Sequence, residues 1–348
     1  KESKIKLKNN SNNSVGKQDG IILLAKQPFY TSFSSLNIIK KALKTSKVGH
    51  TGTLDSFAQG LLVVCTGRLT KLAGNITEFD KTYEAVIKFG SETDTLEYTG
   101  QVIKTTDLPT EEELISVLKR YNGQMEQIPP SFSAIHINGK RASDLVRSGH
   151  DVEIPKRQIN IFYNKLIAVQ KNAENKVEYA HIEFSVSKGT YIRSLARDIG
   201  ADCSSSAHLI GLFRTKVGNF KIEDSVGKKY LNEFNIKNCI ENVNLYFNSY
   251  KDSLPKISES IKDEILENIY SFKEDVSNQC GFVNLHLVNE QKEDDFLHGR
   301  YLKSSHFADK IEFIKQNENC AVFSSAGEFV GLIEKDAQNK FKYKFVIN

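Results

Sequence analysis

The strongest constraint on the fold is a change of hydrophobic period along the first 220 residues. Apolar and polar side chains alternate in residues 83–89 and 177–187, as they do in half-buried strands. Apolar residues recur at helical spacing in 32–44 and 192–199. The run Gly20–Leu24 suits a buried strand. These periods predict a segment in which strands and helices share one core.

Other segments have different patterns of polar and apolar residues. Residues 110–113, Thr-Glu-Glu-Glu, form a capping box that predicts the start of a helix. The polar, Pro-punctuated stretch 121–155 is too long for an ordinary connection, so we expect an insertion with its own role. Residues 260–270 predict an amphipathic helix, and short apolar runs in 281–348 predict a small all-β module.

Charge is unevenly distributed along the 348 residues. The net charge is +4, made up of +3 in residues 1–20, +5 in 21–220 and −4 in 221–348. A polyanionic partner would therefore bind the first 220 residues. Residues 1–20 contain few apolar groups and predict a flexible basic tail.

Composition also predicts what the chain lacks. No apolar run approaches the roughly 20 residues needed to cross a bilayer, and the polar N-terminus has no apolar signal core, so we expect a cytoplasmic protein that does not bind membranes. The five cysteines include no C-x-x-C pair, which suggests neither a disulfide framework nor a zinc site.

Three segments contain candidate catalytic or ligand-binding residues. Residues 47–55, Lys-Val-Gly-His-Thr-Gly-Thr-Leu-Asp, precede an apolar run, and their glycines would let a ligand approach the backbone. Taken alone, a Gly-rich turn with Asp55 as a cap explains this segment as well. Residues 187–193 could bind phosphate at a helix N-terminus or form a simple strand-to-helix turn. Tyr83, taken alone, is more typical of a core residue than of a stacking platform.

Considered together, these segments resemble the bacterial TruB family, tRNA pseudouridine synthases that act on the T loop. The resemblance covers about residues 21–220. It rests on five segments in the family's order and spacing: GHTGTLD (49–55), DKTYEA (80–85), PPSFSAIHINGKRA (129–142), SKGTYIR (187–193) and AHLIGLFRT (207–215).

The resemblance implies an α+β fold. We expect a pseudouridine synthase fold with a mixed, largely antiparallel sheet in residues 21–235 and a thumb insertion at about 121–155. A helical connecting segment would span 236–285, and a small PUA-like β-barrel 286–348.

The resemblance also implies an isomerase without cofactor or metal, expected to be a monomer, that detaches uracil from ribose through N1 and rejoins it through C5. Asp55 would be the catalytic aspartate, as a nucleophile or in removal of a ribose proton. Arg193 would pair with Asp55. Tyr83 would stack on the uracil, and Tyr191 and Leu212 would help to wall the pocket.

The expected partner is the T stem-loop of tRNA, whose uridine 55 would be flipped out of the loop. His50 would fill the space that the base leaves. Thumb residues Lys140 and Arg141 would contact phosphates, and Lys26 and Lys71 would give support or phosphate contacts.

The chain departs from the family pattern in several places. Phe29 replaces a Gly, Ser56 replaces a Pro, and Phe213 replaces an Arg. Two other functions fit the same residues. An RNA-folding chaperone would bind tRNA with catalysis secondary, and a guide-RNA-dependent synthase is disfavoured by the bacterial-type thumb sequence.

Overall fold

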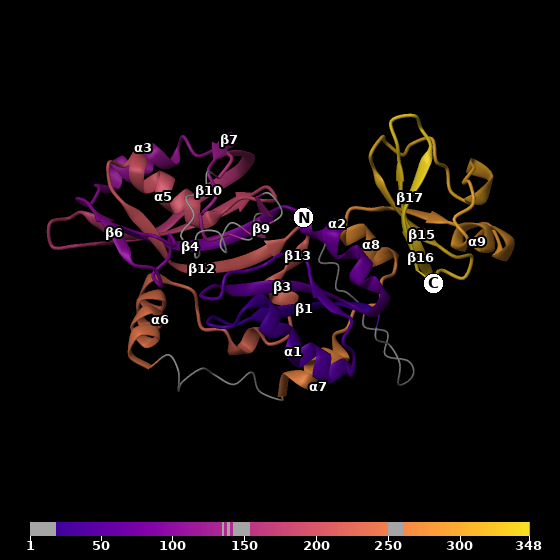
Figure 1. The fold of residues 1–348 in the computed structure, drawn as a ribbon, viewed down its shortest axis with the longest axis horizontal. Coiled ribbons are helices and arrows are strands. Elements are labelled where there is room, and N and C mark those ends of the chain that lie inside the picture. Colours follow the sequence, from indigo (N-terminus) through magenta and orange to yellow (C-terminus); the bar gives the residue numbers. More distant parts are fainter. Residues whose placement is uncertain (1–18, 134–135, 138–139, 142–153, 250–259, 348) are drawn as a thin grey trace.

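A nine-stranded sheet is the centre of the structure, a computed structural model that describes residues 19–133, 136–137, 140–141, 154–249 and 260–347 (Figure 1). The strand order is β1-β3-β12-β4-β11-β10-β7, with β2 paired to β3 and β13 paired to β12. The strands are β1 (Gly20–Lys26), β2 (Val48–His50), β3 (Gln59–Thr66), β4 (Lys81–Phe89), β7 (Gly123–Gln127), β10 (Arg157–Lys171), β11 (Val177–Val186), β12 (Ala207–Val217) and β13 (Phe220–Lys221).

Almost all pairings in this sheet are antiparallel. The exception is β12 with β3, which run parallel over two residue pairs, Phe213 with Gln59 and Arg214 with Gly60. Gly60 has a φ of +122°, and a Cβ there would lie 2.4 Å from the Arg214 carbonyl oxygen, so only glycine fits this close approach. The sheet confirms the predicted α+β class and its largely antiparallel order.

Helices cover the sheet as their apolar periods predict. Leu114 of α3 and Leu195 of α5 are buried in one core cluster with strands β4 and β11. The predicted capping box of α3 is present, with the Thr110 hydroxyl accepting from the Glu113 N–H. The helices are α1 (Ser32–Leu43), α2 (Ala73–Thr77), α3 (Glu111–Leu118), α5 (Ile192–Asp202), α6 (Ile236–Ser249), α7 (Ser260–Glu267), α8 (Glu274–Gln279) and α9 (Glu290–Leu297).

A second, four-stranded sheet lies at the C-terminal end (Figure 1, yellow). Its order is β14-β15-β16-β17, with β14 and β15 parallel and the other pairs antiparallel. Phe282 and Phe323 of this region share an apolar cluster with Ile21 and Leu61 of the main sheet. The strands are β14 (Val283–His286), β15 (Asn319–Phe323), β16 (Phe329–Lys335) and β17 (Phe341–Val346). A PUA-like barrel in this region stays a prediction.

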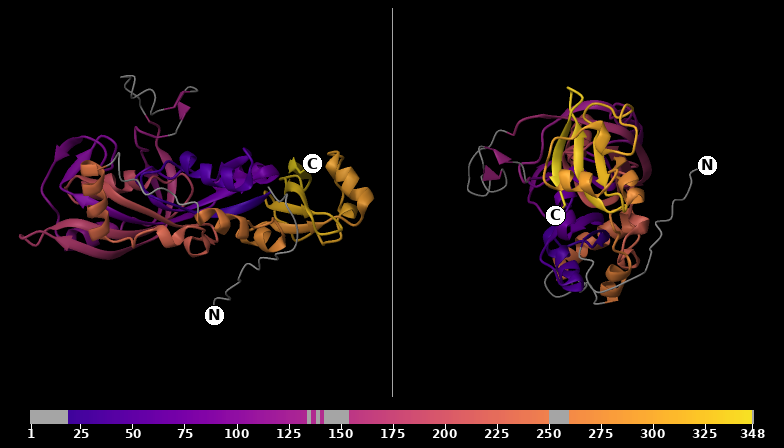
Figure 2. Two further views of the ribbon diagram at one scale, coloured as in Figure 1. Left: turned by 90° about the horizontal axis from the view of Figure 1, so that it is seen from below. Right: turned by 90° about the vertical axis from the view of Figure 1, so that its right-hand side faces the viewer.

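Part of the segment expected to form the thumb belongs to the main sheet. β7 pairs with β10 through five residue pairs, so the chain leaves the sheet only after Gln127. The hairpin of β8 (His136–Ile137) and β9 (Lys140–Arg141) follows. In the left view of Figure 2 this magenta hairpin projects from the sheet. Residues 142–153, also expected in the thumb, lie outside the described residues, as does most of the expected tail.

Two smaller details complete the fold. Helix α7 ends at Glu267, three residues before the predicted Tyr270, because Tyr270 instead exchanges two backbone hydrogen bonds of 2.9 Å with Ile21 of β1. A separate hairpin joins β5 (Ser91–Thr93) to β6 (Val102–Thr105). In the described part of the chain, no helix is long and apolar enough to cross a membrane.

Candidate active site

Asp55 lies on the loop between β2 and β3. The loop doubles back on β3, since Thr51 donates its N–H and its hydroxyl to the Val63 carbonyl at 3.0 and 3.1 Å. Gly52 has a φ of +131°. This backbone conformation is strained for any residue with a side chain, so the turn needs a glycine at this position. The Asp55 side chain is 34% exposed, which leaves its carboxylate open to a ligand.

Arg193, in the first turn of α5, approaches Asp55 with two nitrogens. Its Nη2 donates to Oδ1 at 3.2 Å, and its Nε lies 3.0 Å from Oδ2 without hydrogen-bond alignment. The guanidinium also donates to the carbonyls of Thr95 and Phe132, each at 3.1 Å. Its side chain is only 8% exposed. These contacts fix the arginine, which in turn orients the carboxylate.

Two buried cations hold the Asp55 loop by its backbone. Lys26, at the end of β1, donates to the carbonyls of Gln27, Ser56 and Ala58 at 2.9, 3.3 and 2.6 Å. Arg214 of β12 donates to those of Leu61, Gly52 and Thr53 at 2.8, 3.1 and 3.4 Å. Both sides of the loop are therefore tied to the sheet.

Burial decides between the two roles expected for Lys26. The residue is 1% exposed, so it supports the loop, and its ammonium is not open to a phosphate. This burial lowers the pKa of Lys26 to about 7, against the opposing effect of the Asp55 charge. Lys71 lies elsewhere, and its Nζ donates to the Val346 carbonyl of β17 at 2.7 Å. It therefore ties the 3-10 helix Gly67–Leu72, which follows β3, to the C-terminal sheet.

The wall of the site comes from β4 and β12. Tyr83 pairs with Arg214, and Ala85 with Leu212, so Tyr83, Leu212 and Arg214 lie on one face of the sheet. Tyr83 is 8% and Leu212 5% exposed, within the core cluster that includes Leu54 and Phe57 of the Asp55 loop. The fold therefore brings the predicted wall residues beneath this loop.

His50 and Tyr191 flank the same region. The Gly52 N–H donates to His50 Nδ1 at 3.4 Å, and burial, with the charge of Arg214, lowers the pKa of His50. Both the lowered pKa and the hydrogen bond to Nδ1 favour the uncharged form of the imidazole. Tyr191, before α5, exchanges two hydrogen bonds with the Gln127 side chain, and burial raises the pKa of its phenol.

Glu97 is a titratable residue of the site that the sequence analysis missed. Its Oε1 accepts from the Thr99 hydroxyl at 2.6 Å, and its Oε2 is buried with no hydrogen-bond partner among the described residues. Burial and the charge of Asp55 raise the pKa of Glu97 to about 7, while Thr99 and Arg193 oppose the shift. Nothing in the acidic run 92–97 distinguishes it. The role of Arg214 was missed as well, because its partners are backbone carbonyls, and no residue type in the sequence identifies them.

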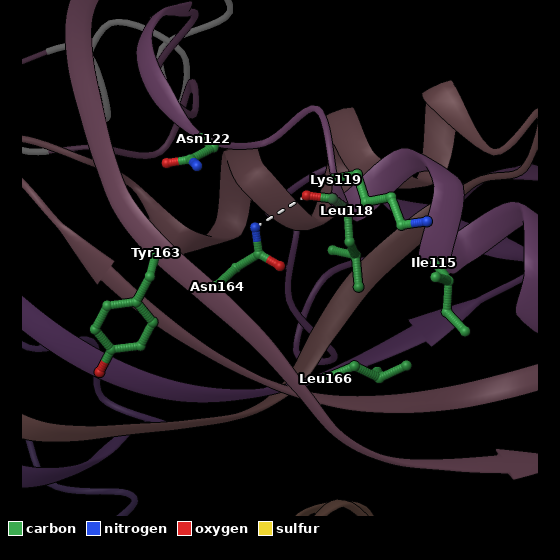
Figure 3. A pocket seen from close by; sticks show the side chains of 7 residues that line it. All are labelled: Ile115, Leu118, Lys119, Asn122, Tyr163, Asn164 and Leu166. Atoms are coloured by element: carbon green, nitrogen blue, oxygen red, sulfur yellow. Dashed lines mark hydrogen bonds between the residues drawn. The ribbon is translucent and has the colours of Figure 1, made fainter.

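The remaining predicted residues, Lys140 and Arg141, form β9 of the projecting hairpin. A cavity of about 410 Å³ lies away from all of these, between α3 and β10 (Figure 3). It is lined by Ile115, Leu118 and Leu166 with a few polar groups, and the Asn164 amide beside it donates to the Leu118 carbonyl. This cavity has no carboxylate, so it offers none of the chemistry of the Asp55 site.

Two solved structures share this fold over most of their length. One is titled "Crystal Structure of a Cbf5-Nop10-Gar1 Complex", with 22% identity, a TM-score of 0.61, and coverage of 95% of this chain and 85% of that one. The other is "Structure of H/ACA RNP bound to a substrate RNA containing 2'-deoxyuridine", with 20% identity, a TM-score of 0.62, and coverage of 98% and 93%. At these identities the likeness concerns the fold alone.

Sequence relatives define the family. Residues 40–192 match the model described as "TruB family pseudouridylate synthase (N terminal domain)". A tRNA pseudouridine synthase B of Treponema denticola is 50% identical over 228 residues, 62% of this chain and just under two thirds, 64%, of that protein. One of Borreliella burgdorferi is 38% identical over 259 residues, 74% of this chain and 90% of that protein.

The match to these relatives places the chain in the class of pseudouridine synthases, which are isomerases. The chain belongs to the TruB family of pseudouridylate synthases.

Proposed function

We propose that this protein is a tRNA pseudouridine synthase that converts uridine 55 of the T loop to pseudouridine. The observation that carries the proposal is the Asp55 carboxylate, which pairs with Arg193 through one hydrogen bond and a second close nitrogen and is still 34% exposed. Relatives named tRNA pseudouridine synthase B supply the substrate class.

The reaction conserves atoms. The bond between ribose C1′ and N1 breaks, a bond between C1′ and C5 forms, C5 loses its proton, and N1 ends protonated. Asp55 acts on the ribose side, either as a nucleophile or in proton removal. Arg193 keeps its carboxylate aligned, while Tyr83 stacks on the uracil and is placed to take part in proton transfer from C5.

Access to the base requires flipping, because a uridine stacked within the T loop cannot reach Asp55. His50 suits the space the base leaves, because burial lowers the pKa of its imidazole and so favours the uncharged ring, which costs less to desolvate between bases. Tyr191 and Leu212 complete the pocket. Lys140 and Arg141 on the projecting β9 meet phosphates, in keeping with the +5 charge of residues 21–220.

The test compares Asp55→Asn with Asp107→Asn, a control at an exposed aspartate before α3. Each variant is incubated with unmodified tRNA, and pseudouridine is mapped by carbodiimide chemistry or mass spectrometry. We expect Asp55→Asn to bind the T stem-loop and form no pseudouridine, because an amide can neither attack nor remove a proton. Asp107→Asn should match the wild type.

Four outcomes would contradict or extend parts of the proposal. Turnover by Asp55→Asn would remove the catalytic role of Asp55. Product at another tRNA position would overturn the assignment of uridine 55. Activity that appears only with an added guide RNA would identify a guide-dependent synthase, and full rescue of tRNA folding by Asp55→Asn would favour a chaperone.

A further inference from the structure

Helix α6 docks closely on the sheet that holds the active site. A Cβ on Gly211 of β12 would lie 2.3 Å from Cys239 Sγ of α6, so the glycine permits this approach. Cys239 and Ile236 are buried in the same core cluster as Leu54 and Tyr83. Figure 1 shows α6 beside the main sheet, near β4 and β12. The helix lies outside the segment 40–192 that matches the family model.

Near the C-terminal end of α6, Tyr246 joins a cluster of aromatic rings. Its ring centroid lies 5.4 Å from Tyr98, edge to face at 81°, and 6.3 Å from Phe29, nearly parallel at 18°. Tyr98 in turn contacts Phe57 at 5.7 Å and 86°. These geometries are the ones aromatic pairs prefer, so the contacts are specific.

Two of the rings that Tyr246 touches, Phe29 and Tyr98, belong to segments beside the catalytic pair, and a third is Phe247 of α6 itself. The Phe29 N–H donates to the carbonyl of Ser56, the residue after Asp55, at 2.7 Å. Tyr98 lies three residues after Thr95, whose carbonyl accepts a hydrogen bond from Arg193. Tyr246 thus contacts both the side of the site that holds the carboxylate and the side that holds the guanidinium.

The backbone at Phe29 needs this support. Its φ is +70°, the left-handed region, which is unfavourable for a bulky residue and persists only where the surroundings hold it. This is the position where the chain departs from the glycine of the family pattern. The stacked ring of Tyr246 and the Ser56 carbonyl are two of the contacts that hold it.

We propose that Tyr246 is a positioning residue, which through Phe29 and Tyr98 sets the separation of the Asp55 loop and the Arg193 side of the site. It touches no reacting atom. The inference rests on the proposed function for its kinetic test. Because small misplacements of reacting groups slow chemistry more than binding, its loss should reduce kcat and leave RNA affinity largely unchanged.

The experiment compares Tyr246→Ala with Tyr246→Phe, which keeps the ring, and with Leu245→Ala, a control at a 41% exposed neighbour on the same helix. Single-turnover pseudouridine formation and the Kd for a T stem-loop are measured for each. We expect Tyr246→Ala to slow the reaction about tenfold or more, with Kd within about twofold. Tyr246→Phe and Leu245→Ala should remain near the wild-type rate.

A second measurement does not depend on activity. Hydrogen exchange followed by mass spectrometry should show faster exchange across residues 54–58 in Tyr246→Ala than in Tyr246→Phe. If Tyr246→Ala fails to fold, Tyr246→Leu keeps apolar volume without the ring and takes its place in both measurements.

The outcomes separate the two proposals. A wild type that forms no pseudouridine would end the proposed function, and the exchange result would still decide the role of Tyr246. An active wild type with an equally active, folded Tyr246→Ala would overturn the positioning role alone. Equal losses in Tyr246→Phe, or an equal weakening of RNA binding, would overturn it too.

Discussion

Two buried lysines, Lys26 and Lys335, each end a strand, one in the main sheet and one in the C-terminal sheet. Each is the last residue of its strand, β1 or β16, and each donates to loop carbonyls. Lys26 binds three carbonyls beside Asp55, whereas Lys335 binds those of Ile311 and Ile314 at 3.3 and 2.9 Å. Their exposed fractions are 1% and 9%.

The two lysines differ in the residue that the bound loop contributes to the structure. The loop at Lys335 contributes the buried Ile314 to an apolar cluster, whereas the loop at Lys26 contributes Asp55. A lysine bound to carbonyls is therefore a general means of fixing a loop, since each bond satisfies a backbone acceptor that burial would otherwise leave unpaired. It affects chemistry only where the loop includes a reacting group.

The largest expected effect is on catalysis at Lys26. In Lys26→Met the Ala58 carbonyl loses its side-chain donor and the Ser56 carbonyl keeps only the Phe29 N–H, so the Asp55 loop can shift relative to Arg193. We expect the rate of pseudouridine formation to fall on the order of 100-fold. Single-turnover assays on T stem-loop RNA measure it, with circular dichroism to verify the fold. A folded variant at the wild-type rate would show that Arg214 alone fixes the loop.

Lys335→Met is the matched change in the other sheet. Two carbonyls lose their donor, so we expect the free energy of unfolding to drop by about 1–3 kcal/mol. Pseudouridine formation should be unchanged, because no catalytic group lies on that loop. Urea titration and the same kinetic assay measure the two quantities. A loss of activity without a loss of stability would mean that the C-terminal sheet acts on the site directly.

The charge of Lys26 gives a third prediction. Burial lowers the pKa of Lys26 to about 7 in the folded protein from its ordinary value of 10.5, so between these pH values the unfolded chain binds more protons than the folded one. The stability of the wild type should therefore rise with pH through this window, relative to Lys26→Met. Urea titrations at pH 6.5, 8 and 9.5 measure the difference. A difference that stays flat, or falls with pH, would contradict a lysine that loses its proton on burial.

The two lysines also show where sequence analysis succeeds and fails. The alternation in 83–89 predicts β4, and the capping box predicts the start of α3, because both depend on neighbours in sequence. Lys26 and Arg214 bind carbonyls up to 162 residues away in the chain, and no local pattern encodes such contacts. Their structural role therefore appears only in the fold.

Other misses have physical causes of the same kind. β7 has the polar sequence Gly-Gln-Met-Glu-Gln, in which Met125 is the one apolar residue and packs against the core cluster, so its strand character depends on pairing with β10. In the sequence Glu97 is one of several neighbouring acidic residues. Only its burial in the fold, which raises its pKa, distinguishes it from them. Asp55, Arg193 and Tyr83 were found because a family resemblance identified them, whereas composition and period alone left each of them open.

The smallest expected effect is at an exposed cation of the C-terminal sheet. Lys344 of β17 pairs with Glu334 of β16, with side chains 41% and 24% exposed. Water screens such a pair, so Lys344→Ala should change the free energy of unfolding by no more than about 0.5 kcal/mol, and the effect should shrink further in salt. Urea titration at low and high ionic strength measures it. A loss as large as that of Lys335→Met would show that exposed charges matter to this sheet as much as the buried clamp does, which would erase the distinction drawn between them.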